Sequence, residues 1–233
     1  MPKVSAIIPA HDEAATIAGV IQPLLAEASI DEIIVVDDGS SDDTATRARD
    51  AGAKVISIPV TGGKAAAMAR GVAAARHDIL YFSDADVTGL TAEMVESILE
   101  PVASRDAAMF VGIRGRKAYW ANRLLHFTPI IGGQRALSRE LWDQVPSTYK
   151  KNFQIEIALN FFAKQRGHRM GFKVMPAFGQ VIKERKRGLL PGLWQRLAMI
   201  GDILIVSWRL YVLLQLQLLM ERLMSRVRTA SEP

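Results

Sequence analysis

Short, continuously apolar segments alternate with helical patterns through the first half of the chain. A parallel sheet with helices on both faces produces this alternation, because its strands are buried on both sides. The pattern therefore predicts an α/β fold with a mostly parallel sheet. The expected strands are 4–8, 33–36, 55–58, 79–82 and 109–111, and the expected helices are 14–28, a segment after Asp42, 64–76 and 91–104.

The chain beyond residue 114 follows this alternation less regularly. We divide the sequence into one α/β domain, residues 1–188, and a helical tail, residues 189–233. The elements expected beyond residue 114 are a strand at 134–137, a helix at 154–166, two strands near 172–174 and 180–182, and a tail helix at 189–228.

The composition of the 233 residues fits a globular protein. Hydrophobic residues make up 49% of the chain, and the absence of cysteine excludes a disulfide scaffold and a cysteine zinc site. The net charge of +5 favours anionic partners such as phosphorylated substrates, nucleic acid or an acidic membrane surface. Residues 1–5 lead directly into a strand without the apolar stretch of a signal peptide, so we expect a cytoplasmic location.

Three of the predicted strands end in clusters of polar and acidic residues. The clusters are residues 9–13 (PAHDE), 37–40 (DDGS) and 83–86 (SDAD). Ligands of open parallel sheets bind at the carboxyl ends of the strands. We therefore expect the three clusters to meet at one edge of the sheet and to form a ligand site.

Asp84 and Asp86 are the candidates for a metal site. Two carboxylates one residue apart at a strand end can bind a hard divalent cation, Mn²⁺ or Mg²⁺. Such a cation would neutralise a diphosphate leaving group. For this motif alone, a turn in which an aspartate caps the next helix is the alternative. The two other clusters favour the metal.

Two further loops carry candidate ligand groups. Segment 37–44 contains four aspartates, which repel phosphate, so we expect Asp38 to accept hydrogen bonds from a nucleobase or ribose. Asp42 or Asp43 is expected to begin the next helix. In segment 61–64 (TGGK), a glycine turn and a lysine precede a helix whose N-terminus favours an anion. A simple turn is the alternative, and the spacing differs from that of an ATPase P-loop.

In this order the motifs resemble those of family 2 glycosyltransferases, which have the Rossmann-like GT-A fold. The resemblance covers roughly residues 4–166. Within the family the chain is most similar to the polyprenyl-phosphate glycosyltransferases, dolichol-phosphate mannose synthase among them. The matching segments are 8–13 (IPAHDE), 36–40 (VDDGS), 63–64 (GK), 84–86 (DAD), 133–137 (GQRAL) and 154–156 (QIE).

The resemblance implies an inverting transfer of sugar from a nucleoside-diphosphate sugar. Asp86, with Asp84 beside it, would carry the metal, and Glu156 would be the general base for a hydroxyl acceptor. A polyprenyl phosphate is already anionic and needs no base, so Glu156→Gln would distinguish the two acceptors. The resemblance assigns nucleotide-sugar contacts to Pro9, Ala10, Glu13, Asp38, Lys64 and Asp84, and acceptor or phosphate contacts to Arg114, Arg116, Arg123, Gln134 and Arg135.

The tail is expected to form an amphipathic helix on a membrane surface. It is rich in leucine, but Asp202 and Arg209 interrupt the apolar stretch that a spanning helix requires. The basic run 183–187 suits anionic headgroups. We therefore expect a lipid or polyprenyl-phosphate acceptor at the inner face of the cell membrane. The alternative acceptor is a small soluble hydroxyl compound, such as a sugar acid or saccharide. The alternatives for the tail are a homo-oligomerisation helix and a helix packed on the domain itself.

Two other functions compete with glycosyl transfer. A nucleotidyltransferase would favour a glycine-rich loop with an arginine after the first strand, where this chain has Asp12 and Glu13. A nucleic-acid-binding protein would fit the net positive charge. The acidic clusters at the proposed site disfavour that function, because they repel the phosphate backbone.

Overall fold

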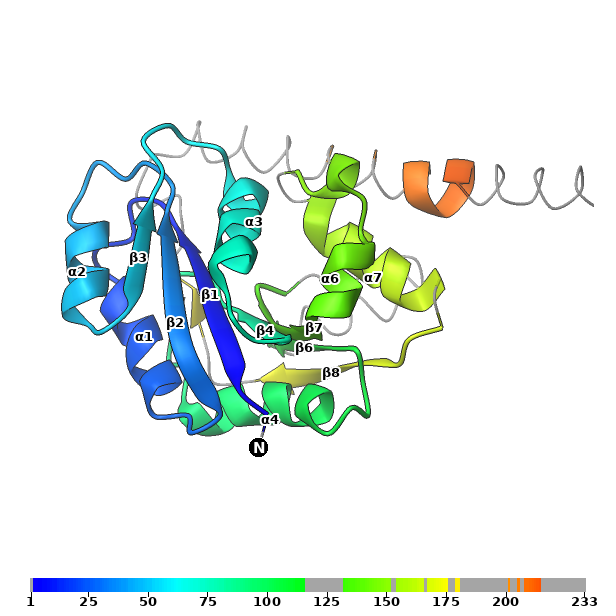
Figure 1. Ribbon diagram of the computed structural model, residues 1–233, viewed down its shortest axis with the longest axis horizontal. Coiled ribbons are helices and arrows are strands. Elements are labelled where there is room, and N and C mark those ends of the chain that lie inside the picture. Colours follow the sequence, from blue (N-terminus) through cyan, green and yellow to red (C-terminus); the bar gives the residue numbers. More distant parts are fainter. Residues whose placement is uncertain are drawn as a thin grey trace, which may run out of the picture.

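The computed structural model of the protein shows an α/β fold built on one large sheet (Figure 1). It describes residues 2–115, 132–151, 154–165, 167–175, 179–180, 201, 205 and 208–214. The strands are β1 (Val4–Ala10), β2 (Ile30–Asp37), β3 (Lys54–Ser57), β4 (Ile79–Phe82), β5 (Val87–Thr88), β6 (Met109–Arg114), β7 (Gln134–Ser138), β8 (Met170–Met175) and β9 (Gly179–Gln180). Seven of them form one sheet in the order β3-β2-β1-β4-β7-β6-β8, and β5 pairs with β9.

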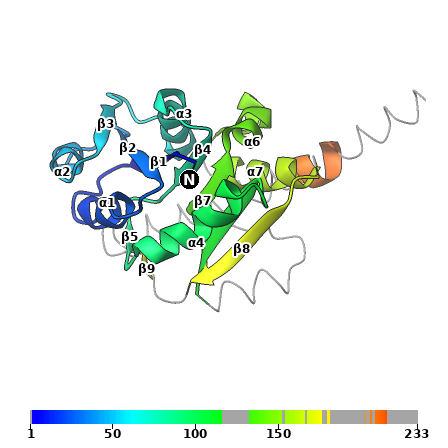
Figure 2. The ribbon, with the colours of Figure 1, turned by 60° about the horizontal axis from the view of Figure 1, so that its bottom comes forward.

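Helices cover both faces of this sheet (Figures 1 and 2). They are α1 (Ile17–Leu25), α2 (Thr44–Asp50), α3 (Lys64–Ala74), α4 (Ala92–Ala103), α6 (Arg139–Gln144), α7 (Gln154–Gln165) and the single turn η1 (Ser147–Tyr149). Successive side chains of a strand point to opposite faces. Accordingly, Ala6 and Ile8 pack in a core with α1 and α4, whereas Ile7 packs in a second core with α3, α6 and α7. Both faces of β1 are therefore buried, as its apolar run predicts.

Strand β7 is the exception to the parallel arrangement. It runs antiparallel to both of its neighbours, β4 and β6, while the pairs β1–β2, β1–β4, β2–β3 and β6–β8 are parallel. In the β4–β7 register, Phe82 faces Arg135. The start of β7 therefore lies beside the end of β4, at the carboxyl edge of the sheet.

The observed elements differ from the predicted ones mainly at their ends. The helix predicted at 14–28 begins only at Ile17, because the carbonyl of Glu13 accepts the amides of Thr16 and Ile17 in a turn that precedes it. The helix predicted at 64–76 ends at Ala74, since Ala75 is extended. The sequence pattern does not predict α6 or β5.

Most of the predicted tail helix lies outside the described residues. Its described part includes a π-helical turn, η2 (Arg209–Leu214). There Leu210 is fully buried, and the ring of Tyr211 lies edge-on to Phe161 of α7, with 4.9 Å between centroids. In the part of the chain that the structure describes, no helix is long and apolar enough to cross a membrane.

A network of charged side chains joins β1 and β2 at the amino edge of the sheet. Asp31 accepts a hydrogen bond from Lys3 at 2.6 Å, and Glu32 accepts hydrogen bonds from the Ser5 hydroxyl and the Arg76 amide, both at 2.7 Å. Burial by itself raises the pKa of Glu32, but the two hydrogen bonds and the charge of Arg76 outweigh it. The pKa of Glu32 therefore lies below its ordinary value of 4.5.

Candidate active site

The first two polar clusters lie together at the carboxyl edge of the sheet, as predicted. The amide of Asp12 donates to the Ser40 hydroxyl at 2.9 Å, and the amide of Glu13 donates to the Thr44 hydroxyl at 2.8 Å. The Glu13 carboxylate is 9% exposed and accepts a hydrogen bond from Thr16 at 3.1 Å. The loops after β1 and β2 therefore hold each other in place.

Asp38 joins the loop after β2 to the glycine turn before α3. Its carboxylate, on a residue only 4% exposed, accepts the amides of Gly62 and Gly63 at 2.7 and 2.8 Å. Gly63 has a φ of 82°, a conformation that glycine adopts at little cost. The anion expected at the start of α3 is thus supplied by the chain itself, because the Asp38 carboxylate holds both glycine amides.

Asp42 is the aspartate that fixes the start of α2. It accepts the amides of Thr44 at 3.0 Å and Ala14 at 3.1 Å, whereas the side chain of Asp43 makes no capping hydrogen bond. Of the two predicted candidates, Asp42 therefore binds the helix start and also ties it to the loop after β1.

Lys64, Asp84 and Glu156 form a cluster of charges at the centre of the site. The Lys64 ammonium lies 2.7 Å from Asp84 Oδ1 and 2.6 Å from Glu156 Oε1. The side chains of Lys64 and Asp84 are about a quarter exposed, at 23% and 24%, and that of Glu156 is 5% exposed. Burial by itself lowers the pKa of Lys64, but the two carboxylates outweigh it and raise that pKa above the ordinary lysine value. The lysine is therefore held in its charged form.

Arg135 is the second cation of this cluster. Its guanidinium is 1% exposed, donates to the Gly132 carbonyl at 3.1 Å and lies 3.7 Å from Glu156 Oε2. Burial lowers the pKa of Arg135, and the charges of Glu156 and Asp84 oppose this shift. Sequence reasoning assigned Arg135 to the acceptor. The enclosed guanidinium contacts Glu156 and the turn before β7, and its contact with the acceptor stays a prediction.

Gln134 also makes contacts other than the predicted acceptor contact. Its amide oxygen accepts the Tyr81 hydroxyl at 2.7 Å, and its amide nitrogen donates to the Ser83 hydroxyl at 2.9 Å. All of these groups are buried, and the Ser83 hydroxyl donates to the Asp84 carbonyl at 3.2 Å. Both ends of the Gln134 amide therefore fix the strand end that carries Asp84, and a contact of Gln134 with the acceptor stays a prediction.

Gly133 sets the position of Asp84 from the other side. A Cβ atom built on Gly133 would lie 1.7 Å from Asp84 Oδ2, so any side chain there would displace the carboxylate. Asp86, two residues further on, is 5% exposed. The structure therefore places one aspartate at the charge cluster and the other in a buried position beside it.

The structure adds residues that sequence reasoning did not assign to the site. Tyr81, Ser83 and Gly133 support Asp84, and only the glycine pair of segment 132–135 (GGQR) could have indicated such a close approach. Pro9 and Ala10 end β1 at the predicted edge. Arg114 ends β6, but its side chain and all of Arg116 and Arg123 lie outside the described residues, as does the basic run 183–187.

A mostly parallel sheet with acidic loops and an Asp-x-Asp motif at its carboxyl edge defines the GT-A class of nucleotide-sugar-binding folds. Residues 5–162 match the family model described as Glycosyl transferase family 2. Because this match covers more than half of the 233 residues, the chain belongs to glycosyl transferase family 2.

Individual relatives agree with this membership. Glucosyl-3-phosphoglycerate synthase of Mycolicibacterium paratuberculosis is 38% identical over 117 residues, which are 46% of this chain and 36% of the relative. The 4,4'-diaponeurosporenoate glycosyltransferase of Staphylococcus aureus is 35% identical over 98 residues, which are 40% of this chain and 26% of the relative. The chain thus matches only about a third of the length of the first curated relative and about a quarter of the second.

A solved structure matches over a longer stretch. It is glucosyl-3-phosphoglycerate synthase from Mycobacterium tuberculosis in complex with Mn²⁺, uridine diphosphate and phosphoglyceric acid. The TM-score is 0.73 at 26% identity, with 88% of this chain and 78% of that chain covered. This similarity confirms the predicted GT-A fold.

Proposed function

We propose that this protein transfers a sugar from a nucleoside-diphosphate sugar to a small soluble hydroxyl acceptor that carries an acidic group. The transfer would be an inverting displacement that depends on a divalent metal. The observation that carries the proposal is the contact of Lys64 with both Asp84 and Glu156. The first turns of α3 and α7 and the loop after β4, which are far apart in sequence, thereby meet at the edge where a sheet of this class binds its ligand.

The donor side follows from the fixed loops. Asp38 and Glu13 are buried at the carboxyl edge of the sheet. Pro9 and Ala10 are the last two residues of β1 at the same edge. Carboxylate oxygens and strand-end carbonyls are acceptors that suit a nucleobase and ribose hydroxyls. The ammonium of Lys64 supplies a positive charge for the diphosphate, and its release from Asp84 would accompany donor binding.

A divalent cation fits the two aspartates. Asp84 Oδ1 already holds an ammonium group at 2.7 Å, so this position attracts positive charge, and carboxylate oxygens are the ligands that Mg²⁺ and Mn²⁺ prefer. In the described part of the chain, no three His, Cys, Asp or Glu side chains gather as a metal-binding set. The remaining ligands would then be diphosphate oxygens and water, as is common for Mg²⁺. When bound, the metal stabilises the charge on the departing diphosphate.

Glu156 is suited to receive the proton of an acceptor hydroxyl. Its Oε1 is held by Lys64, while the buried Oε2 has no hydrogen-bond donor among the described residues. A buried carboxylate oxygen without a donor is costly unless a ligand satisfies it. A hydroxyl group at Oε2 would be within reach for proton transfer.

The similarity to synthases named for phosphoglycerate supports the soluble acceptor over the lipid acceptor that the sequence first suggested. The test is product formation, measured by mass spectrometry, from UDP-glucose or GDP-mannose with Mn²⁺ and either 3-phosphoglycerate, glycerate or a polyprenyl phosphate. We expect a glycosylated soluble acid. Product from polyprenyl phosphate alone would contradict the proposal.

The variant Glu156→Gln tests the proton acceptor separately. Loss of a general base should lower turnover by about 100-fold or more with a hydroxyl acceptor. Glu96→Gln, the same change on an exposed residue of α4, is the matched control and should leave turnover unchanged. A mild effect of Glu156→Gln would instead indicate an acceptor that is already anionic at the reacting atom.

The membrane-surface role of the tail is a separate proposal. Ile205 and Trp208 are exposed, at 53% and 60%, while Leu210 and Tyr211 face the domain. Two exposed apolar side chains on a helical segment suit an interface with lipid or with another subunit. Sedimentation with anionic liposomes, with and without residues 189–233, decides between these partners. Equal sedimentation of both chains would contradict membrane binding.

A further inference from the structure

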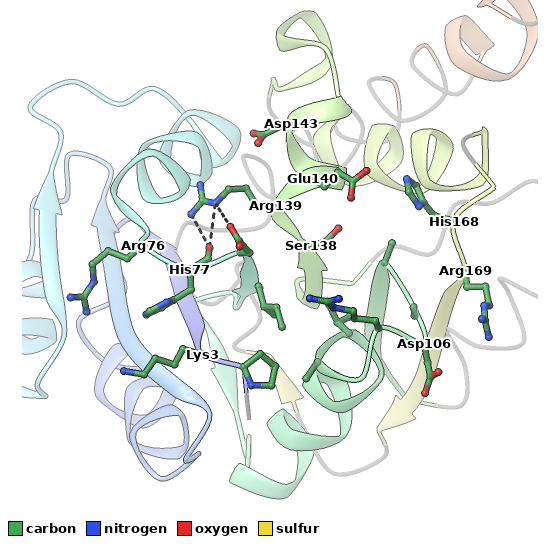
Figure 3. A pocket seen from close by; sticks show the side chains of 18 of the residues that line it. Lys3, Arg76, His77, Asp106, Ser138, Arg139, Glu140, Asp143, His168 and Arg169 are labelled. Atoms are coloured by element: carbon green, nitrogen blue, oxygen red, sulfur yellow. Dashed lines mark hydrogen bonds and ion pairs between the residues drawn. The ribbon is translucent and has the colours of Figure 1, made fainter.

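A hollow of about 940 Å³ opens at the amino edge of the sheet, opposite the candidate active site (Figure 3). We call it the basal hollow. Its wall contains residues 2–3 before β1, 76–79 at the start of β4, 102–108 after α4, 138–143 around the start of α6, and 167–169 before β8. The seven residues of β1 separate the two edges by roughly 20 Å, at about 3.3 Å per residue. The basal hollow is therefore a different site from the Asp84 cluster.

Basic groups lie deeper in the basal hollow than acidic ones. The titratable side chains of its wall that are only partly exposed are His77, Arg139 and His168. Its acidic residues all stand on exposed positions, and the side chain of Asp78 is 97% exposed. Exposed carboxylates are screened by water and salt, so they lower the electrostatic potential inside the basal hollow only slightly. The partly buried charge of this wall is therefore the positive charge of Arg139.

Arg139 provides a fixed positive charge in this wall. Its guanidinium donates to the carbonyl of Ala75 at 2.8 Å and to that of His77 at 2.9 Å, and these bonds immobilise it. Figure 3 shows the contact with His77. Of the described carboxylates, that of Asp78 lies nearest in an ion pair, at 3.9 Å. Carbonyl oxygens orient the guanidinium without cancelling its charge.

Arg105 has an unusual backbone conformation for an arginine. It follows the end of α4 with a φ of 66°, a left-handed conformation in which glycine is normally found. An arginine there costs stability relative to glycine. The side chains of Arg105 and Arg169 both line the basal hollow at exposed positions, and neither makes a hydrogen bond or ion pair with any described residue. Two arginines with unused donors thus line the cavity that also contains the fixed charge of Arg139.

We infer that the basal hollow binds a small anion with two or more phosphate or carboxylate groups, held by Arg105 and Arg169. Arginine presents planar donors that match both kinds of oxyanion. The Ala108 amide donates to the Arg169 carbonyl at 2.8 Å, so Arg169 lies beside the segment that follows Arg105. A ligand with several acidic groups would contact both side chains and would also be attracted by Arg139. The strained conformation of Arg105 is then explained by the charge that it delivers to the cavity.

The test uses the full chain, ¹⁵N-labelled and free of divalent metal, titrated with inorganic pyrophosphate in one series and citrate in another at constant ionic strength. Saturable shifts are expected for the backbone amides of Ala107 and Ala108 in the basal hollow. The amides of Gly39 and Gly62 mark the candidate active site. The probe that binds more tightly identifies the preferred acidic group. Shifts confined to the active-site amides, or no saturable shift with either probe, would overturn the inference.

Arg105→Gly separates binding from folding. Glycine suits the φ of 66°, so this variant should unfold at a temperature equal to or above that of the wild type. Loss of a hydrogen bond to a charged group should weaken anion binding by about tenfold or more, and Arg169→Gln should act similarly. Arg49→Gln, the same loss of charge on an exposed residue of α2, is the control. Unchanged affinity in both Arg105→Gly and Arg169→Gln would overturn the assignment.

Discussion

The ion pairs of Lys64 give the most quantitative prediction about the candidate site. Lys64 neutralises both Asp84 and Glu156, at 2.7 and 2.6 Å, and the Glu156 side chain is 5% exposed. Breaking a buried ion pair by removing one partner costs about 3–5 kcal/mol. Because the Lys64 side chain is 23% exposed, water can partly replace it, and we expect Lys64→Met to lower the free energy of unfolding by about 2–3 kcal/mol.

Glu156→Gln should cost less, about 1 kcal/mol, because Lys64 keeps its contact with Asp84. Removal of Lys64 alone leaves two carboxylates without it, whereas in the double variant only that of Asp84 is left, so the two effects should not add. We expect the double variant to be more stable than the sum of the single effects predicts by about 1.5 kcal/mol or more.

The wild type, the two single variants and the double variant form a double-mutant cycle. The free energy of unfolding of each protein is measured by urea unfolding at neutral pH without added metal. Equal dependence on urea concentration in the four proteins shows that the unfolded states are comparable. Additivity within about 0.5 kcal/mol would refute the coupling of Lys64 and Glu156. A larger loss of unfolding free energy in Glu156→Gln than in Lys64→Met would refute the predicted order of the two single effects.

Three further predictions concern the scaffold of the site and the amino edge. Asp38→Asn replaces one of two charge-assisted acceptors with a donor and should cost about 2 kcal/mol in urea unfolding, whereas Asp43→Asn, at a side chain with no capping hydrogen bond, should cost almost nothing. Gly133→Ala should displace the carboxylate of Asp84 and abolish metal-dependent turnover while the protein remains folded by circular dichroism; full activity would contradict the close approach. The folded-state pKa of Glu32 is lowered, so its stabilising contribution is present above the unfolded value of about 4.3 and is lost as pH falls through the folded value. Glu32→Gln should therefore flatten the acid side of a plot of unfolding free energy against pH, and an unchanged slope would contradict this.

The sequence predicts the parallel half of the sheet because strands buried on both faces must be continuously apolar. The three polar clusters stand out for the same reason, since each interrupts the apolar pattern where a strand ends. The positions of β1, β2 and β4 and the meeting of their loops follow from that pattern alone.

The direction of β7 could not be predicted in this way. Its residues Gln134–Ser138 indicate a short strand, but only tertiary pairing with β4 and β6 decides that it runs antiparallel. The resemblance assigns Gln134 and Arg135 to the acceptor, but nothing in their local sequence predicts that these two polar side chains are buried. Both are 1% exposed, and their partners, such as Tyr81 and Glu156, lie 53 and 21 residues away along the chain.

The contact between Lys64 and Glu156 could not be predicted from the sequence either. The two residues are 92 positions apart, and nothing in the local sequence of either indicates the other. The family resemblance names both as site residues, but only the fold, which brings the first turns of α3 and α7 together, produces the ion pair.

Calorimetric titration with uridine diphosphate tests the central claim most directly. In the presence of Mn²⁺ we expect saturable binding of one nucleotide per chain. Asp86→Asn or removal of the metal should weaken that binding by about tenfold or more, while Arg105→Gly should bind as the wild type does. Absence of nucleotide binding, or affinity that neither metal removal nor Asp86→Asn alters, would contradict a metal-dependent nucleotide-sugar site at this edge of the sheet.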